Sequence, residues 1–168
     1  MLEIRRLRDT DSLDEISRIY ALSWKKAYRG IIPDGYLDSI SETRWSALLK
    51  IKSKRLLLAV EDGKIIGVST YEAARDKKMS GWGEIISLYL LPSHYRKGVG
   101  TVLFSAVVNE LLHDGYDRIY LWVLEENKAA RDFYEKNGFS FNGDINADNI
   151  GGIAVNEVRY IYSLTAEK

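Results

Sequence analysis

The spacing of hydrophobic positions in the first half of the chain predicts a strand, two helices and a hairpin. Leu2 to Leu7 alternates apolar and charged side chains, as a half-buried strand does. Thr10-Asp11-Ser12 offers capping side chains to a following helix, and a second helix is predicted from Asp34 to Lys50. Two apolar runs joined by Glu61-Asp62-Gly63 predict a hairpin. These runs are Arg55 to Val60 and Lys64 to Tyr71.

The second half predicts strands that alternate with helices, followed by a strand pair. An apolar run from Ile85 to Leu91 ends at Pro92. After Gly98, apolar residues recur at helical spacing, and Gly115 marks the end of that helix. These apolar residues are Val99, Val102, Leu103, Ala106, Val107 and Leu111. The remaining predicted elements are a strand at Arg118 to Leu124, a helix at Asn127 to Phe139, and a strand pair at Ser140 to Leu164 with its loop at Asn146 to Gly152.

Composition narrows the class of protein. The chain has 168 residues, 46% of them hydrophobic, which is enough for a single domain over residues 1–168 with a substantial core. The 24 basic and 24 acidic residues balance, which argues against a nucleic-acid partner, because such partners favour a basic excess. With no cysteine and only His94 and His113, we expect no disulfide, thiol nucleophile or metal site. We see no secretion signal and no apolar run of membrane-spanning length, so we expect a cytoplasmic protein without a membrane partner.

A basic loop and two glycines stand where a strand and a helix meet. The loop is Tyr95-Arg96-Lys97, and Gly98-Val99-Gly100 opens the helix. First-turn N–H groups lack partners within a helix, and glycine omits the Cβ atoms that would hold a phosphate away from them. The sequence therefore predicts a phosphate-binding site. It is neither a Walker motif, because Thr101-Val102 follows Gly100, nor a dinucleotide fingerprint, because Leu103 replaces the third glycine.

Two stretches resemble motifs of the GNAT superfamily of N-acetyltransferases. Residues 83–112 resemble motif A, in which a strand carrying a Glu leads into Gln/Arg-x-x-Gly-x-Gly/Ala, although Tyr95 here replaces the Gln or Arg. Residues 127–139 resemble motif B through Asn127, Ala130, Phe133, Tyr134, Gly138 and Phe139. The resemblance implies an α/β (α+β) fold with a mixed, mostly antiparallel central sheet of six to seven strands. About four helices would flank this sheet, which would be splayed at the strand that binds coenzyme A.

The resemblance implies an enzyme that uses acetyl-CoA as co-substrate and needs no metal. Backbone N–H groups of the glycine loop would bind the pyrophosphate, and the preceding strand would pair with the pantetheine arm as if with a missing strand. The cofactor-binding residues implied are Leu88, Leu90, Tyr95, Arg96, Lys97, Gly98, Val99, Gly100, Thr101 and Asn127. Asn127 is also a suitable helix N-cap, and the two roles are compatible.

Two side chains are candidates for the chemistry of acetyl transfer. Tyr134 would protonate the departing thiolate, because a phenol near pKa 10 stays protonated at neutral pH; the alternative is that it packs in the core. Glu84 stands fourteen residues before Gly98, where several family members place a catalytic Glu, and burial would raise its pKa. The alternative is a Glu exposed at the end of its strand. An alkylammonium lies about six pKa units above an ordinary Glu, so a relay through water is easier than direct proton abstraction.

The implied acceptor is a primary amine of a small molecule or peptide, which would attack acetyl-CoA directly in a ternary complex. In the family, the first two helices and their loop cover the acceptor, so Trp24, Tyr28, Ile31 and Ile32 would line its pocket; the alternative is that they belong to the core. A second interpretation of the chain is a non-catalytic acyl-CoA-binding sensor or regulatory module. A hydrolase is excluded, because the sequence has no Gly-x-Ser-x-Gly elbow. The acceptor's identity, the acyl-chain preference and the oligomeric state, including a homodimer, stay open.

Overall fold

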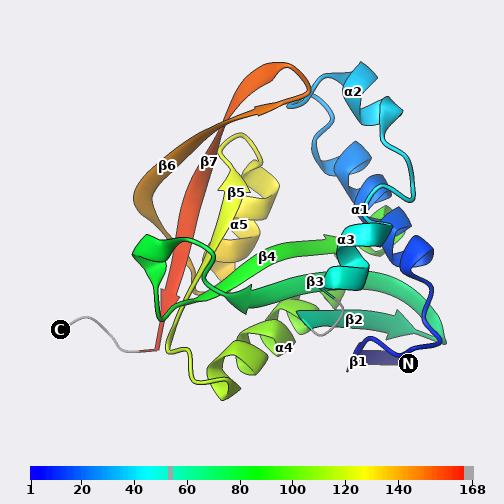
Figure 1. Cartoon of the computed structure of the whole chain (residues 1–168), viewed down its shortest axis with the longest axis horizontal. Coiled ribbons are helices and arrows are strands. Elements are labelled where there is room, and N and C mark those ends of the chain that lie inside the picture. The colour runs from blue at the N-terminus through cyan, green and yellow to red at the C-terminus, as the bar shows by residue number, and fades with distance from the viewer. Residues whose placement is uncertain (53–54, 165–168) are drawn as a thin grey trace.

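The computed structural model describes residues 1–52 and 55–164, and its centre is a seven-stranded sheet in the order β1-β2-β3-β4-β5-β7-β6 (Figure 1). Neighbouring strands are antiparallel except β4 and β5, which run parallel. The strands are β1 (Leu2–Arg6), β2 (Leu56–Glu61), β3 (Lys64–Ala73), β4 (Gly83–Leu90), β5 (Arg118–Leu124), β6 (Ser140–Ile150) and β7 (Ile153–Ser163). The α-helices are α1 (Leu13–Ala27), α2 (Asp34–Ser39), α3 (Ser46–Ile51), α4 (Val99–His113) and α5 (Lys128–Lys136), with short 3-10 helices η2 (Lys77–Met79) and η3 (Pro92–His94). The mixed, mostly antiparallel sheet expected from the sequence is confirmed.

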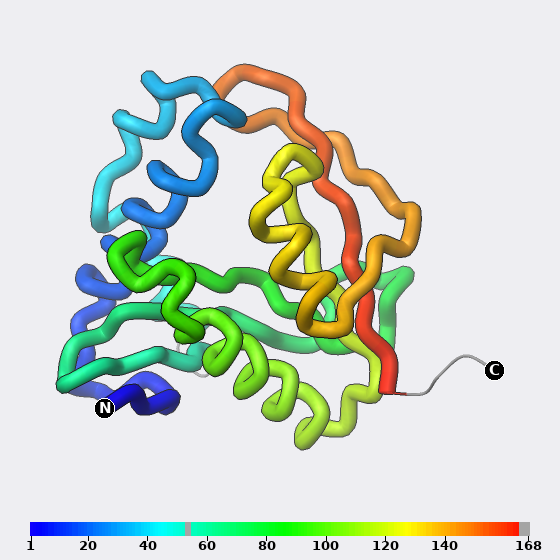
Figure 2. The backbone as a smooth tube through the Cα atoms, turned by 180° about the vertical axis from the view of Figure 1, so that it is seen from behind, coloured from blue at the N-terminus to red at the C-terminus, as the bar shows by residue number. Residues whose placement is uncertain are grey.

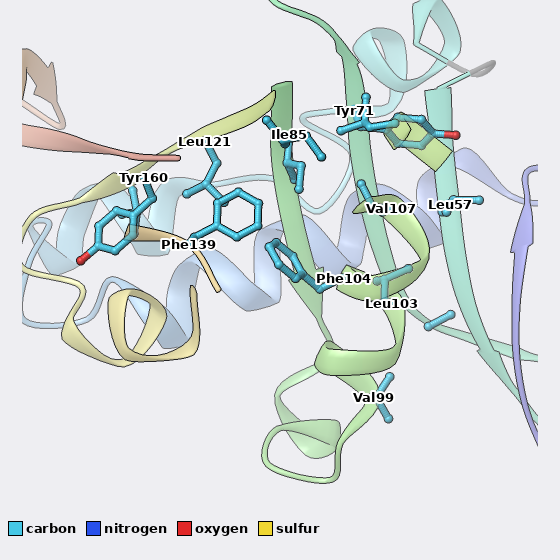
Figure 3. Packing of buried hydrophobic residues seen from close by; sticks show 14 of the residues in the cluster. Leu57, Tyr71, Ile85, Val99, Leu103, Phe104, Val107, Leu121, Phe139 and Tyr160 are labelled. Carbon is cyan, nitrogen blue, oxygen red and sulfur yellow. The ribbon is translucent and has the colours of Figure 1, made fainter. Parts of the chain in front are cut away.

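Alternation along the strands gives the sheet two apolar faces. In β2, Leu57 contributes to the core under α4, whereas its neighbour Leu58 packs with α1 on the other face. Figure 2 shows α4 and α5 together on the side opposite to that of Figure 1. The α4 side chains Leu103, Phe104 and Val107 point toward the strands (Figure 3). These buried side chains anchor the glycine-loop helix to the sheet, whereas Val102, predicted on the same apolar face, is 47% exposed.

Local signals in the sequence fix several of these elements. Asp62 and Gly63 both have positive φ, +49° and +80°, which is the two-residue hairpin turn expected between β2 and β3. Ser12 caps α1, because its hydroxyl accepts a hydrogen bond from the N–H of Glu15 at 3.3 Å. Gly115 (φ +94°) ends α4, with the N–H of Tyr116 reaching back to Leu111 at 3.1 Å.

The single helix predicted from Asp34 to Lys50 is wrong. The chain forms α2 and α3 instead, separated by residues 40–45. Ile40 is extended (ψ 117°) and only 3% exposed, because its side chain packs in the core beside Leu37. The Ser41 hydroxyl then accepts a hydrogen bond from the N–H of Thr43 at 3.2 Å, a local bond that competes with helix formation.

The long loop predicted from Asn146 to Gly152 is also wrong. β6 continues to Ile150 and β7 begins at Ile153, so Gly151 and Gly152 alone make the turn, with φ of +63° and +85°. β6 is an edge strand whose residues are almost all exposed, so its polar run needs no apolar alternation. None of the helices in residues 1–52 and 55–164 is long and apolar enough to cross a membrane.

Candidate active site

The sheet opens between its two parallel strands. β4 and β5 pair at three positions, and the last pair is Ile85 with Leu121. Beyond that point the two strands diverge, as Figure 1 shows. Five residues of β4 and three of β5 therefore border an opening rather than each other. This is the splay expected at the strand that binds coenzyme A.

A β-bulge at Ile86 bends β4 at the start of the opening. Against β3, Ser87 pairs with Thr70 and Ile85 with Tyr71, so Ile86 is an extra residue on β4. A buried cluster of hydroxyls holds the bulge from the α1 side. The Ser87 hydroxyl accepts from the N–H of Thr70 at 3.2 Å and hydrogen-bonds the hydroxyl of Tyr20 at 2.9 Å. The bulge is thus fixed by side chains as well as by the strand ladder.

Backbone donors of β4 face the opening. The N–H of Leu91 donates to the carbonyl of Ile66 in β3 at 2.8 Å. Because successive N–H groups of a strand point to opposite sides, those of Leu90 and Leu88 point away from β3. Their side chains pack against the core under α4. The two residues expected to bind a pantetheine arm therefore present unpaired backbone to the open edge.

The N-terminus of α4 has no side-chain cap. Gly98 occupies the capping position with φ +82°, and among the described residues other than its two chain neighbours no atom lies within 4 Å of where its Cβ would be. In the described part of the chain, no acceptor contacts the N–H groups of Val99, Gly100 and Thr101. These three donors and the helix dipole make the expected anion site, whereas α1 and α5 are capped by Ser12 and Asn127.

The basic loop before α4 is held by its tyrosine. The Tyr95 hydroxyl lies 3.0 Å from the Ser23 hydroxyl of α1, which ties the loop to the opposite face of the sheet. Arg96 has a positive φ of +59° and is exposed, as is Lys97. Neither cation has an ion-pair partner among the residues described. Tyr95 therefore positions the loop, while two unpaired cations stand beside the helix N-terminus.

Helix α5 places Tyr134 on the α4 side of the sheet. The side chain of Asn127 accepts a hydrogen bond from the N–H of Ala130 at 3.3 Å, which confirms its capping role. Gly138 (φ +86°) ends the helix, and the N–H of Phe139 reaches back to the carbonyl of Tyr134 at 3.0 Å. The ring of Tyr134 packs 5.6 Å from that of Phe104 of α4, measured between centroids. Both ends of the short helix thus fix the position of this ring.

The hydroxyl of Tyr134 is free. It makes no hydrogen bond to any residue in 1–52 or 55–164, although the ring is half-buried. Burial, followed by the neighbouring phenol of Tyr89, raises the pKa of Tyr134 above its ordinary value. The phenol is thus a weaker acid than the sequence alone suggested. It stays protonated at neutral pH, but complete proton transfer from it to a thiolate is uphill.

Glu84 is buried and fully bonded. Its carboxylate accepts two hydrogen bonds from the Arg75 guanidinium, 2.7 and 3.2 Å long, one from the N–H of Arg75 at 3.0 Å, and one from the Tyr120 hydroxyl at 2.8 Å. Burial alone would raise the pKa of Glu84, but the bonds from Arg75 and Tyr120 outweigh it, and the pKa is lowered. The expected upward shift is therefore wrong. Whether Glu84 takes part in proton transfer stays a prediction.

Aromatic side chains from α1 and β4 meet on the other side of the opening. The indole N–H of Trp24 donates to the hydroxyl of Tyr89 at 3.0 Å. The ring of Tyr28 packs edge-on against that of Trp24, with 4.9 Å between the centroids. Burial raises the pKa of Tyr89 to about 12, and that of Tyr28 also lies well above its ordinary value. Tyr28 also interacts electrostatically with Tyr134. Phenols from three elements thus converge on the opening.

Ile31 and Ile32 differ in their surroundings. Ile31 lines a cavity of about 210 Å³, together with Leu124, Glu125, Glu126, Ala154, Val155 and Asn156. Ile32 is only 1% exposed and packs in the core with Leu37, so it supports this wall from behind. Nearby, the β6–β7 turn packs closely on α2, where a Cβ on Gly151 would come within 2.8 Å of Tyr36.

Sequence reasoning missed four residues of this region, Tyr89, Glu157, Arg75 and Tyr120. The sequence pattern places Tyr89 in the core of an apolar strand and Arg75 in a polar turn, so neither was predicted to be functional. Glu157 has a weak signal in the sequence, because it and Arg159 are charged residues within a largely apolar strand. Among the described residues, no group of three or more His, Cys, Asp or Glu side chains is placed to hold a metal ion.

The split sheet and uncapped glycine loop are the features that the resemblance to N-acetyltransferases predicted. The sequence profile of the acetyltransferase (GNAT) family matches residues 14–139, and the chain belongs to this family. It is therefore an enzyme of the acyltransferase class.

Named relatives agree with this family. The chain is 27% identical over 131 residues to the N-acetyltransferase YuaI of Bacillus subtilis, which spans 77% of this chain and 75% of the relative. It is 28% identical over 160 residues to a spermidine N(1)-acetyltransferase of Thermoplasma acidophilum, spanning 89% and 94%. Among solved structures, it resembles the PaiA N-acetyltransferase of Thermoplasma acidophilum in complex with coenzyme A. That match has a TM-score of 0.78, 25% identity, and covers 97% of this chain and 99% of the other.

Proposed function

We propose that this protein transfers an acetyl group from acetyl-CoA to a primary amine of a small molecule or peptide, by direct attack in a ternary complex. The observation that carries the proposal is the uncapped N-terminus of α4, which follows directly on the open strand β4. One continuous stretch from Leu88 to Thr101 then offers backbone donors both to an extended arm and to a phosphate group.

Two sets of backbone N–H groups would bind different parts of acetyl-CoA, the pyrophosphate and the pantetheine arm. The N–H groups of Val99, Gly100 and Thr101 would bind the pyrophosphate, with Arg96 and Lys97 adding positive charge. The N–H groups of Leu88 and Leu90 would bind the pantetheine amides and the thioester carbonyl, where a fixed donor stabilises the developing oxyanion. Asn127 keeps its amide nitrogen available for the same arm while its oxygen caps α5.

Tyr134 is the side chain that we propose to act on the leaving sulfur. Its hydroxyl has no partner within the described residues, and its raised pKa keeps it protonated. Because full proton transfer from such a phenol is uphill, the hydroxyl would act by donating a hydrogen bond to the sulfur as negative charge develops there. The proton lost by the amine can then complete the thiol through solvent.

The acceptor would enter from the side of the aromatic residues Trp24, Tyr28 and Tyr89. The amine must be neutral when it attacks. Glu84 would contribute mainly by holding Arg75 and Tyr120, because its four hydrogen bonds leave little capacity for another donor. The name of the Thermoplasma relative makes an aliphatic polyamine the first acceptor to test.

The test is a panel of amines incubated with acetyl-CoA, with free thiol as the readout. The panel should contain polyamines, aminoglycosides, amino acids and peptides with a free N-terminus. Amine-dependent thiol release, with the acetylated amine identified by mass spectrometry, is the expected result. Tight acetyl-CoA binding without turnover for any amine would contradict the proposal and favour a regulatory acyl-CoA-binding protein.

A further inference from the structure

Glu157 is a half-buried carboxylate with little bonding. It lies on β7, opposite Leu124 of β5 and Asn146 of β6. Within residues 1–52 and 55–164, its carboxylate accepts one hydrogen bond, a long one of 3.4 Å from the side-chain amide of Asn146. In the described part of the chain no lysine, arginine or histidine forms an ion pair with it. A carboxylate can accept about four hydrogen bonds, and a buried charge is costly unless it is paired, so this group has capacity for a cation.

The surroundings of Glu157 belong to the acceptor side of the opening. Its cross-strand partner Leu124 packs in the same cluster as Trp24 and Tyr28, which places Glu157 near these aromatic residues. In keeping with this position, its charge raises the pKa of both Tyr28 and Tyr89. Burial raises the pKa of Glu157 and Asp148 raises it further, while the bond from Asn146 and the charge of Arg75 oppose them. The pKa of Glu84 shifts in the opposite direction, because Arg75 forms hydrogen bonds to that carboxylate directly. Of these two carboxylates, one is saturated by the protein and the other is left for a ligand.

The cavity beside Glu157 has an acidic wall. Leu124 both lines this cavity and pairs with Glu157 across the strands, so the two are adjacent. Glu125 and Glu126 also line it, and none of its lining residues is basic. A cationic ligand that extends from Glu157 into this cavity would therefore meet an acidic wall, with apolar contacts from Ile31 and Val155 for a hydrocarbon chain.

We propose that Glu157 binds an ammonium group of the acceptor other than the one that reacts, so that the enzyme selects aliphatic diamines and polyamines over monoamines and amino acids. This inference rests on the proposed acetyl transfer and adds the acceptor class and the residue that selects it. The reacting amine would lie nearer to Tyr89 and the thioester, while the second, charged amine stays on the carboxylate. Only an acceptor with two amines can use both positions.

The experiment compares two acceptors of equal chain length, 1,4-diaminobutane and butylamine, with spermidine as a third. The wild type should show a higher kcat/KM for the diamine than for the monoamine. In Glu157→Gln, kcat/KM for the diamine should fall by about 10- to 100-fold, as expected for a lost charged hydrogen bond, while butylamine changes by less than about threefold. Glu157→Asp should restore part of the preference. The KM for acetyl-CoA should not change in any variant.

Two controls keep the outcomes distinct. Glu15→Gln removes the same charge at the opposite end of α1 from Tyr28, and it should leave the diamine preference unchanged. The thermal shift produced by coenzyme A verifies that Glu157→Gln is folded with an intact cofactor site. Equal losses for diamine and monoamine, or none for either, would overturn the inference while acetyl transfer stands. A wild type inactive on every amine would instead overturn the proposed function.

Discussion

The indole of Trp24 in α1 and the phenol of Tyr89 in β4 are joined by a 3.0 Å hydrogen bond, in which the indole N–H donates. Because Tyr89 is the acceptor in this bond, its own hydroxyl proton is free to point elsewhere. The bond fixes a side chain of the open strand from a neighbouring helix. Because Tyr89 borders the opening, its position should matter for the amine more than for the co-substrate.

Trp24→Phe should therefore raise the KM for the amine by about 3- to 10-fold and leave the KM for acetyl-CoA within about twofold, because a single neutral hydrogen bond is lost. Steady-state kinetics with each substrate varied in turn measure this difference. Trp82→Phe is the matched control, because Trp82 packs under Arg118 at the far end of β5. Equal losses for both substrates, with a lower melting temperature, would place Trp24 in the core alone.

Gly98→Asp should weaken coenzyme A binding by at least 10- to 100-fold, because it brings negative charge to the donors at the start of α4. Calorimetry measures the change in Kd. Gly115→Asp is the matched control at the other end of the same helix. Both glycines have positive φ and open space around the missing Cβ, so the backbone cost should be similar. If the two variants lost affinity equally, the loss would reflect stability rather than the anion site.

Tyr134→Phe should lower kcat by about 10- to 10³-fold with little change in coenzyme A affinity or stability, because the hydroxyl has no partner in the described protein. Tyr160→Phe makes the complementary control. The Tyr160 hydroxyl donates to Glu135 at 2.7 Å and accepts from Arg131 at 3.0 Å, so its loss should lower stability and spare kcat. A wild-type kcat in Tyr134→Phe, with acetyl transfer shown to be rate-limiting, would return Tyr134 to a packing role.

Glu84→Gln should lower stability in a pH-dependent way. The pKa of Glu84 is below its ordinary value of 4.5 in the folded protein, so its pairing with Arg75 stabilises the protein above that pH. This stabilisation is lost as the pH falls through the folded-state pKa. Because the Arg75 side chain is 56% exposed, the difference at pH 7 should be only about 1–2 kcal/mol, or a few degrees in Tm.

The same variant also tests proton transfer by Glu84. We expect its kcat/KM to run parallel to that of the wild type from pH 6 to 10, because Arg75 and Tyr120 already occupy the carboxylate. For the stability effect, thermal unfolding from pH 3 to 8 should show that the difference in Tm between the wild type and Glu84→Gln becomes smaller as the pH falls. A kcat/KM profile that rises toward the pKa of the amine only in the variant would instead restore Glu84 as the proton acceptor.

Elements of the fold could be predicted from the sequence where several local signals indicate the same structure. The strand at Arg118 to Leu124 was predicted with the bounds that the structure has, and α4 starts after Gly98 as predicted, because apolar period, glycine and turn signals agree there. The helix predicted across Ile40 failed because burial of that side chain, a tertiary effect, overrode local propensity. The polar run in β6 was taken for a loop because an exposed edge strand has no apolar face to reveal it.

The parts of the candidate site formed by backbone and glycine could be predicted from the sequence. The parts formed by side chains from different elements could not. The glycine loop and Tyr134 carry motif signals. The bulge at Ile86 appears only when β3 and β4 are compared in register. The opposite bonding of Glu84 and Glu157 depends on Arg75, a turn residue nine positions before Glu84 whose guanidinium direction no sequence pattern specifies.

The opening between β4 and β5 places an unpaired strand edge inside the sheet instead of at its rim. Edges at a rim can template the addition of another protein chain, but this one is flanked by α1 aromatic residues on one face and by α5 on the other. We therefore expect the opening to accept the pantetheine arm, which carries amides but no side chains, rather than another β-strand. A nucleotide without a pantetheine arm should therefore occupy the helix start and leave the slot empty. Hydrogen exchange at Leu88 and Leu90 should accordingly slow with coenzyme A and stay unchanged with adenosine 3′,5′-bisphosphate.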